Sequence, residues 1–320
     1  MTDLADLLHD GITTTVRDGI LTDDRWEPVG VTDQFLGDAD TYHARYFARS
    51  NFLGVVSRLL GLAGVQDVDG MTVLDIGSGS GSSVFPLCTL LPRARVIATD
   101  ISPPLLGMLR RIADADSDLT NKPEVFCHDL HLPTFRDEVF DLVVGTAILH
   151  HLLDPHAALV NAMASLRPGG RIVLVEPLEA GSLMQSVLHE RVLILLDDLG
   201  TPDHPLAKLM EAQRLDTRAR LGPPAPKPWT PHLDDKWVFD VPYLRRLGRE
   251  LGASHVDVHP GPSDTSHVIS GVFRGTLSDA GFPLDDVPPE VWELAREIEN
   301  GISPELRPMF SPTGIIVLTK

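Results

Sequence analysis

Cysteine and basic residues are scarce in this chain of 320 residues. Its two cysteines, Cys88 and Cys127, stand in apolar segments and form no CxxC pair, so we expect buried, reduced thiols rather than a disulfide or a zinc site. The 27 lysines and arginines are outnumbered by 45 aspartates and glutamates, which gives a formal net charge of −18. Because so negative a surface repels polyphosphates, nucleic acid is not expected as a partner.

Long apolar runs are also absent. The stretch at residues 187–196 is interrupted by His189, Glu190 and Arg191 and is too short to cross a bilayer. The first residues, MTDLADLLHDG, are acidic and lack the apolar stretch of a signal peptide. Because 43% of the residues are hydrophobic, the chain can still bury a full core. We therefore expect a cytoplasmic protein with no membrane partner, built as one large domain or as one domain with a substantial appendage.

Hydrophobic spacing divides the chain into four regions. Residues 1–66 have helical spacing and predict an N-terminal helical cover. Short apolar runs separated by helix-length gaps predict a doubly wound α/β core over residues 67–177, with strands at TVLDI, RVIAT, EVFC, FDLVVG and RIVLVE. Residues 178–239 predict a helical and proline-rich lid insertion. Residues 240–320 return to the core with the strands SHVDVHPG and GIIVLTK, around a second insertion at about 262–312 that contains one helix, VWELAREIEN.

A glycine-rich loop, GSGSGSS, follows the first core strand at residues 77–83. It lacks the lysine of a Walker A loop, and Ser82 and Val84 occupy the positions at which a dinucleotide fingerprint needs its last glycine. Asp75, two residues ahead of the loop, would repel a pyrophosphate. The combination favours a ligand that has no phosphate and carries a positive charge, as S-adenosylmethionine (SAM) does at its ammonium group. The glycines would let the backbone approach that ligand closely.

A second aspartate, Asp100, ends the next predicted strand. A carboxylate at this place can accept one hydrogen bond from each hydroxyl of a ribose. SAM and NAD both contain such a ribose, so Asp100 alone does not choose between them. Together with Asp75 it favours SAM and disfavours a nicotinamide-dependent oxidoreductase.

Five segments resemble, in order and in spacing, the motifs of the small-molecule branch of the class I SAM-dependent methyltransferases. They are VLDIGSGSG, ATDIS, CHDLHLP, FDLVVGTAILHHLLDP and LRPGGRIVLVEP, all within residues 71–177, with weaker matches at 240–260 and 313–320. The resemblance implies a Rossmann-like α/β fold with a seven-stranded, doubly wound sheet that is mostly parallel. GIIVLTK would be its reversed last strand. The resemblance also implies SAM as the cofactor and S-adenosylhomocysteine (SAH) as the product.

The same resemblance implies roles for single residues. The implied cofactor-binding residues are Asp75, Gly77, Ser78 and Gly79 at the methionine end, Asp100 at the ribose, Ile101, Asp129 and Leu130 at the adenine, Thr146 and Ala147 at the sulfonium, and Tyr42 above the cofactor. Structural alternatives stay open for two of them. Asp129 also suits a turn after a strand, and Tyr42 also suits an amphipathic helix.

Two adjacent histidines, His150 and His151, follow the fourth core strand. Imidazole can accept a proton near neutral pH. Methyl transfer to a hydroxyl requires a base of this kind, because the hydroxyl must lose its proton. His151 is the first candidate for this base and His150 the second, although either could instead pack or form a structural hydrogen bond. No carboxylate motif such as DxD follows the strand, so we expect no catalytic metal.

The sequence thus predicts a SAM-dependent methyltransferase of a small organic acceptor, with secondary metabolism as the expected setting. O-methylation is favoured over C- or N-methylation. Two alternatives stay open: a SAM-binding protein that catalyses another reaction, and a non-catalytic, methyltransferase-like subunit. Trp229, Trp237 and Phe239 would either line the acceptor pocket or anchor the lid. The apolar segment SVLHERVLILLDDLG would be a core helix or the surface of a homodimer.

Overall fold

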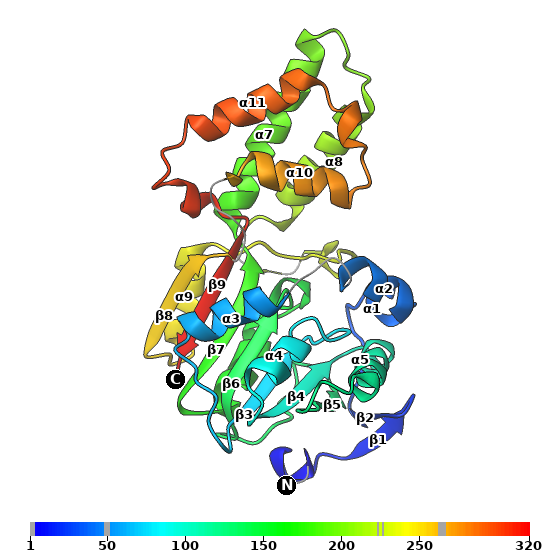
Figure 1. Ribbon diagram of the computed structural model, residues 1–320, viewed down its shortest axis with the longest axis vertical. Coiled ribbons are helices and arrows are strands. Elements are labelled where there is room, and N and C mark those ends of the chain that lie inside the picture. Colours follow the sequence, from blue (N-terminus) through cyan, green and yellow to red (C-terminus); the bar gives the residue numbers. More distant parts are fainter. Residues whose placement is uncertain (1–3, 48–51, 223, 226, 262–266) are drawn as a thin grey trace.

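The computed structural model describes residues 4–47, 52–222, 224–225, 227–261 and 267–320, and a single nine-stranded sheet runs through this part of the chain (Figure 1). The strands are β1 (Thr14–Arg17), β2 (Ile20–Asp23), β3 (Thr72–Ile76), β4 (Arg95–Asp100), β5 (Glu124–Cys127), β6 (Phe140–Thr146), β7 (Leu166–Pro177), β8 (His255–Pro260) and β9 (Thr313–Thr319). Their order is β1-β2-β5-β4-β3-β6-β7-β9-β8. Strands β3 to β7 pair in parallel, and β9 runs antiparallel to both β7 and β8. The predicted Rossmann-like α/β fold with a reversed last strand is confirmed. The predicted count of seven strands is exceeded, because β1 and β2 extend the seven strands β3 to β9 to a sheet of nine.

Helices cover both faces of the sheet. Alternate residues of β3 point to opposite layers: Val73 packs with helices α3 (Phe52–Leu62), α4 (Val84–Leu90) and α5 (Pro103–Ala115), whereas Leu74 packs with α6 (Pro155–Ser165) and α9 (Val241–Glu250). All five residues of β3 are buried, as expected of a central parallel strand. The two layers explain why the core strands are continuous apolar runs rather than alternating ones.

The N-terminal region departs from the prediction. Besides the helices α1 (Asp33–Leu36) and α2 (Ala39–Tyr46) it contains the β1–β2 hairpin, and β2 pairs in parallel with β5. The prediction of helical structure is therefore wrong at residues 14–23. The physical reason is the turn Asp18-Gly19, whose φ angles of 50° and 77° suit the tight hairpin turn that an Asp-Gly pair favours. Residues 48–51, which belonged to the same prediction, lie outside the described residues.

Four helices from the two insertions pack together as one helical unit. They are α7 (Glu179–Asp198), α8 (Pro205–Arg220), α10 (Ser270–Asp279) and α11 (Pro289–Asn300). Their shared apolar cluster includes Leu188, Val192, Met210, Phe273 and Val291. The unit lies beyond one end of the sheet (Figure 1). The helices at α7, α8 and α11 confirm the prediction, whereas α10 and the union of the two insertions were not predicted. Pro223 and Pro226 of the proline-rich stretch, and residues 262–266 of the second insertion, lie outside the described residues.

Short 3₁₀ turns complete the described elements, at Leu4–Leu7, Leu149–His151, Thr230–His232, Leu284–Asp286 and Arg307–Phe310. No helix in the described ranges is at once long enough and apolar enough to cross a bilayer. Both cysteines are buried and unpaired, and burial raises the pKa of each thiol to about 12. The prediction that both thiols are buried is confirmed.

One buried histidine makes the helical unit sensitive to acid. His189 of α7 is 3% exposed, neither ring nitrogen has a hydrogen-bond partner among the described residues, and burial lowers its pKa to about 4. The unfolded chain therefore binds a proton at a higher pH, near 6.5, than the folded chain does. The contribution of His189 to the free energy of unfolding is fully present above pH 6.5. It is lost as the pH falls toward 4, which lowers the free energy of unfolding by roughly 2–4 kcal/mol.

The substitution His189→Leu should remove this acid sensitivity. Denaturant unfolding between pH 7 and 4 should show a smaller fall in the free energy of unfolding for the variant than for the wild type. His255→Leu, on the exposed face of β8, serves as the control and should keep the wild-type pH dependence. Equal pH dependence in all three proteins would contradict the assignment.

Candidate functional site

The glycine loop makes a tight turn between β3 and α4. Three glycines of the loop have positive φ angles: 68° at Gly77, 52° at Gly79 and 105° at Gly81. Residues with a Cβ atom rarely adopt such angles. A Cβ atom at Gly77 would lie 2.6 Å from Ile148, whereas at Gly79 it would meet only Tyr42, at 3.7 Å. The first glycine is therefore needed for packing, and the second leaves the backbone accessible from the side of Tyr42.

Asp75 lies beneath this loop and is fully buried. Its Oδ1 accepts a hydrogen bond from the Ser78 hydroxyl at 2.6 Å, and its Oδ2 has no partner among the described residues. Burial raises the pKa of the carboxyl to about 7. Ser78 lines the cavity described below and Asp75 does not. A contact between Asp75 and the methionine end of a cofactor stays a prediction.

Asp100, at the end of β4, is fixed by two backbone amides. Its Oδ2 accepts a hydrogen bond from the N–H of Gly79 at 2.8 Å, and its Oδ1 accepts one from the N–H of Ser102 at 2.9 Å. Burial raises the pKa of the carboxyl, and the two amides oppose this shift. Because a carboxylate has about four lone-pair sites, both oxygens can accept a further hydrogen bond.

A cavity of about 330 Å³ opens beside the glycine loop; we call it the main cavity. Its lining includes Gln34, Phe35, Tyr42, Tyr46, Phe52, Gly77, Ser78, Gly79, Thr146, Ala147, His150, His151 and Asp235. A smaller recess shares Phe35, Tyr42, Gly77, Gly79, Ala147 and His151 with it and adds Asp100, Ile101, Leu105 and Lys236. The structure thus brings eight of the predicted cofactor residues and both predicted catalytic histidines to these two adjoining spaces.

Aromatic side chains from α1 and α2 form one wall of this space. The ring centroid of Tyr42 lies 5.8 Å from that of Phe35 and 4.7 Å from that of Tyr46. Burial raises the pKa of the Tyr42 hydroxyl, so this group stays neutral. Tyr42 lies beside Gly79 in this lining, and its place above a cofactor stays a prediction.

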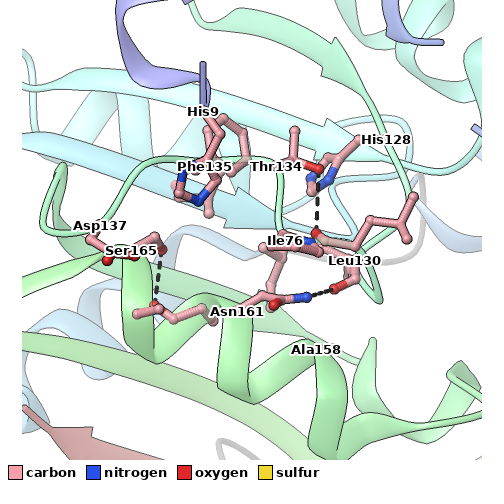
Figure 2. A pocket seen from close by; sticks show the side chains of 15 residues that line it. His9, Ile76, His128, Leu130, Thr134, Phe135, Asp137, Ala158, Asn161 and Ser165 are labelled. Atoms are coloured by element: carbon pink, nitrogen blue, oxygen red, sulfur yellow. Dashed lines mark hydrogen bonds between the residues drawn. The ribbon is translucent and has the colours of Figure 1, made fainter. Parts of the chain in front are cut away.

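Asp129 and Leu130 line neither space. The Asp129 carboxylate bonds to Nδ1 of His131 at 2.7 Å, and Leu130 lines a separate pocket between the loop at 128–135 and α6 (Figure 2). His128, also in that pocket, is buried between Phe126 and Phe135. The predicted adenine contacts of Asp129 and Leu130 stay predictions.

A buried glutamate holds the loop that carries the two histidines. Glu176, at the end of β7, is fully buried and accepts hydrogen bonds from the backbone N–H groups of Ile148, Leu149 and His150 at 3.0, 2.7 and 3.3 Å. The same carboxylate contacts Nδ1 of His150 at 2.6 Å. One side chain therefore fixes both the backbone of this loop and the ring of its first histidine.

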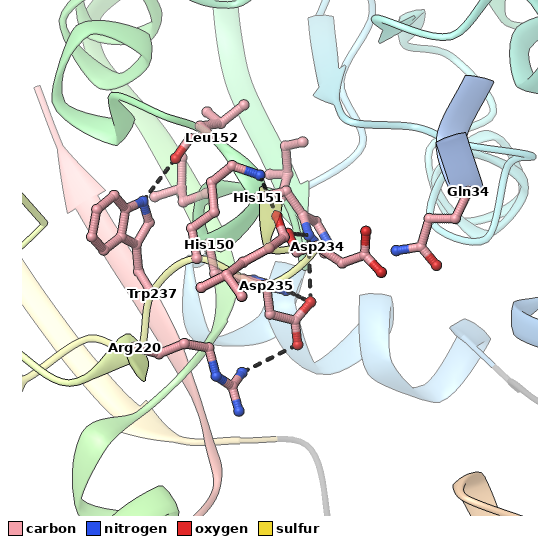
Figure 3. A network of polar contacts seen from close by, with 12 residues as sticks. Gln34, His150, His151, Leu152, Arg220, Asp234, Asp235 and Trp237 are labelled. Atoms are coloured by element: carbon pink, nitrogen blue, oxygen red, sulfur yellow. Dashed lines mark hydrogen bonds and ion pairs between the residues drawn. The ribbon is translucent and has the colours of Figure 1, made fainter. Parts of the chain in front are cut away.

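Asp235 faces both histidines from the other side (Figure 3). Its Oδ1 lies 3.6 Å from Nε2 of His150 and 3.5 Å from Nδ1 of His151, and its Oδ2 lies 3.2 Å from the Arg220 guanidinium. Burial opposes protonation of His150, but the carboxylates of Glu176 and Asp235 outweigh it and raise the pKa of His150 to about 9. Burial and the neighbouring His150 lower the pKa of His151 to about 4. Of the two rings, His151 is the neutral one at physiological pH.

The segment that carries Asp235 is tied to the histidine loop at three points. Nδ1 of His151 lies 2.9 Å from the Asp234 carbonyl oxygen, the N–H of Lys236 donates to the His150 carbonyl at 2.7 Å, and the Trp237 indole donates to the Leu152 carbonyl at 2.7 Å. Trp237 and Phe239 are buried, whereas Trp229 is about half exposed; none of the three lines the main cavity. Trp237 and Phe239 therefore anchor this segment rather than line the cavity.

Two residues of the site, Glu176 and Asp235, were missed in the sequence. Glu176 lies inside the motif LRPGGRIVLVEP, where its position at a strand end was the available signal. Asp235 has no local signal, because it reaches the histidines only through the folding of the lid segment.

Comparison with known proteins identifies a methyltransferase domain in this chain. Residues 74–172 match the model of a methyltransferase domain family. The α/β core belongs to the class I methyltransferase family. The methyltransferase domain is 34% identical over 131 residues to demethylmenaquinone methyltransferase of Thermus thermophilus, an alignment that covers 40% of this chain and 58% of the relative. An uncharacterized 37.1 kDa protein of transposon TN4556 from Streptomyces fradiae is 35% identical over 111 residues, which is 34% of this chain and 30% of that protein.

The fold of the methyltransferase domain has a counterpart among solved structures. A protein from Galdieria sulphuraria, provisionally named a sarcosine dimethylglycine methyltransferase, superposes with a TM-score of 0.51 at 13% identity and covers 90% of this chain and 98% of its own. At that identity the likeness concerns the fold alone. The sequence relatives are matched over less than two thirds of their lengths, at 30% and 58%.

Proposed function

We propose that the protein transfers a methyl group from SAM to a hydroxyl group of a small organic acceptor, in secondary metabolism. One observation carries the proposal: Asp100, the loop residues Gly77 and Gly79, and His151 line the same recess, so a cofactor held by the first three would meet His151. The Thermus relative, whose name states that it methylates demethylmenaquinone, supports a small acceptor.

The residues present suit SAM. The open side of Gly79 lets the protein backbone approach a ligand without a Cβ clash, and the two fixed oxygens of Asp100 can accept hydrogen bonds from both ribose hydroxyls. Tyr42 supplies an aromatic face, which attracts a sulfonium cation as it attracts other cations. When bound, SAM supplies a methyl group that is activated by the positive sulfur.

His151 is the residue that we assign to the acceptor's proton. It accepts the hydroxyl proton while the acceptor oxygen forms its bond to the methyl carbon, and the electron pair of the broken carbon–sulfur bond stays on sulfur. Its pKa of about 4 keeps the ring neutral, so a lone pair is present at physiological pH. His150, held by Glu176, fixes the loop and adds a positive charge beside the developing oxyanion.

A methyl-transfer assay tests the proposal. Purified protein and SAM are incubated with a panel of phenols, aliphatic alcohols, amines and carbon acids, and SAH and the methylated product are quantified by mass spectrometry. Equal amounts of SAH and an O-methylated product are expected for at least one hydroxyl acceptor. SAH binding without any methylated product would instead favour another SAM-dependent reaction or a non-catalytic subunit. Failure to bind SAM and SAH would overturn the proposal.

A further inference from the structure

The polar atoms of His150, His151 and Asp235 converge on one point of the main cavity. One ring nitrogen from each histidine and a carboxylate oxygen lie within 4.8 Å of one another. The 3.6 Å between Nε2 of His150 and Oδ1 of Asp235 exceeds the 2.7–3.2 Å usual for a hydrogen bond. It suits two ligands of one ion, since tetrahedral ligands bound at about 2.0–2.2 Å lie roughly 3.3–3.6 Å apart.

A second polar contact holds each of the three side chains, and in His151 it falls on Nδ1, which leaves Nε2 as the nitrogen free to bind an ion. Nδ1 of His150 bonds to the buried carboxylate of Glu176, and Nδ1 of His151 bonds to the backbone carbonyl of Asp234. The remaining oxygen of Asp235 pairs with Arg220. Metal-binding histidines usually donate their second N–H to a carboxylate or a backbone carbonyl, which fixes the tautomer and aims the free nitrogen at the ion. Both histidines have such a partner here.

We propose that His150, His151 and Asp235 bind one divalent transition-metal ion, of the class of Zn²⁺ or Fe²⁺. Two imidazoles and one carboxylate suit these ions, whereas Mg²⁺ prefers oxygen ligands alone. Three protein ligands leave at least one coordination position free, and all three residues line the main cavity, so that position can face an acceptor. The proposal departs from the expectation of no catalytic metal, because Asp235 is brought to the histidines only by the fold.

The ion's role in catalysis, unlike its binding, rests on the proposed methyl transfer. A hydroxyl oxygen bound to the ion would lose its proton more readily, and the ion would then replace His151 as the group that activates the acceptor. The proton would pass to water, and the methyl group would be transferred to the oxygen as before.

Metal binding can be measured without reference to activity. The full chain is treated with a chelator and titrated with Zn²⁺ by calorimetry and with Co²⁺ by absorption spectroscopy, while SAH binding is measured in parallel. We expect one ion per chain and a Co²⁺ spectrum typical of nitrogen and oxygen ligands. Asp235→Asn and His151→Gln should each weaken ion binding more than 100-fold, and Glu176→Gln should weaken it 10- to 100-fold through His150.

Two matched controls lie on β8, away from the cavity. Asp257→Asn and His255→Gln, both at exposed positions, should bind the ion as the wild type does. Circular dichroism checks that each variant is folded. The proposal is overturned if the folded wild type binds no ion, or if Asp235→Asn, His151→Gln and the controls all bind equally. SAH binding without ion binding would reject the metal site alone, whereas loss of both in the wild type would reject the proposed function as well.

Discussion

The substitution His151→Ala is expected to lower kcat by about 10²- to 10⁴-fold while SAH affinity stays within about threefold of the wild type. His151 lines both the main cavity and the recess, yet Asp100 and the glycine loop are the residues assigned to the cofactor. Loss of the imidazole therefore removes the group that acts on the acceptor and leaves the cofactor contacts in place. Steady-state kinetics with an acceptor from the assay above, together with calorimetry of SAH, measure the two effects.

Two controls separate the roles that His151 could have. His255→Ala, at an exposed position of β8, should keep the wild-type kcat. Chelation of the wild type distinguishes the two chemistries: activity that is lost and then restored by Zn²⁺ or Fe²⁺ indicates an ion, and activity that survives indicates a base. A variant with wild-type kcat would show that His151 performs neither task.

The substitution Asp100→Ala is expected to lower the affinity for SAH by about 10²- to 10⁴-fold. Two hydrogen bonds from ribose hydroxyls to a charged carboxylate contribute about 1.5–3 kcal/mol each, and every 1.4 kcal/mol is tenfold in affinity. The loss is compounded because the N–H groups of Gly79 and Ser102 lose their acceptor as well. Isothermal titration with SAH measures the effect.

Asp100→Asn provides the graded control for that experiment. The amide keeps one acceptor oxygen and loses the charge, so a smaller loss of 10- to 100-fold is expected. Asp257→Asn, on β8, should bind SAH as the wild type does. If folded Asp100→Ala binds SAH with wild-type affinity, the ribose lies elsewhere and the assignment of the recess is wrong.

The core strands could be predicted because each is short, apolar throughout and set off by helix-length gaps. β3 and β6 are buried on both faces, so their continuous apolar residues were enough to indicate strands. The β1–β2 hairpin was missed because Val16 and its neighbours in β1 are mostly exposed and give no apolar run. The helical unit could not be predicted as one body, since α7 and α11 meet only through contacts between segments about a hundred residues apart.

The candidate site residues likewise differ in how far the sequence alone could predict them. Gly77 and Gly79 were predicted from the loop that follows one strand, and Asp100 from its place at the end of the next strand, so a short stretch of sequence was enough for each. Asp235 was not, because its place opposite His150 depends on the anchoring of the lid segment by Trp237. Local sequence patterns indicate candidate site residues that lie close together in the chain. They do not indicate a side chain that a distant segment brings to the site.

The position of β9 between β7 and β8 has a consequence for the protein during its synthesis. Within the described sheet β8 pairs with no strand other than β9, and the outer edge of β7 is likewise closed by β9. Residues 313–319 leave the ribosome after both of these strands. Until then β7 presents an open, apolar edge, the kind of surface on which nascent chains pair with one another. The nascent chain should therefore depend most on chaperones in the interval between the synthesis of β7 and that of β9.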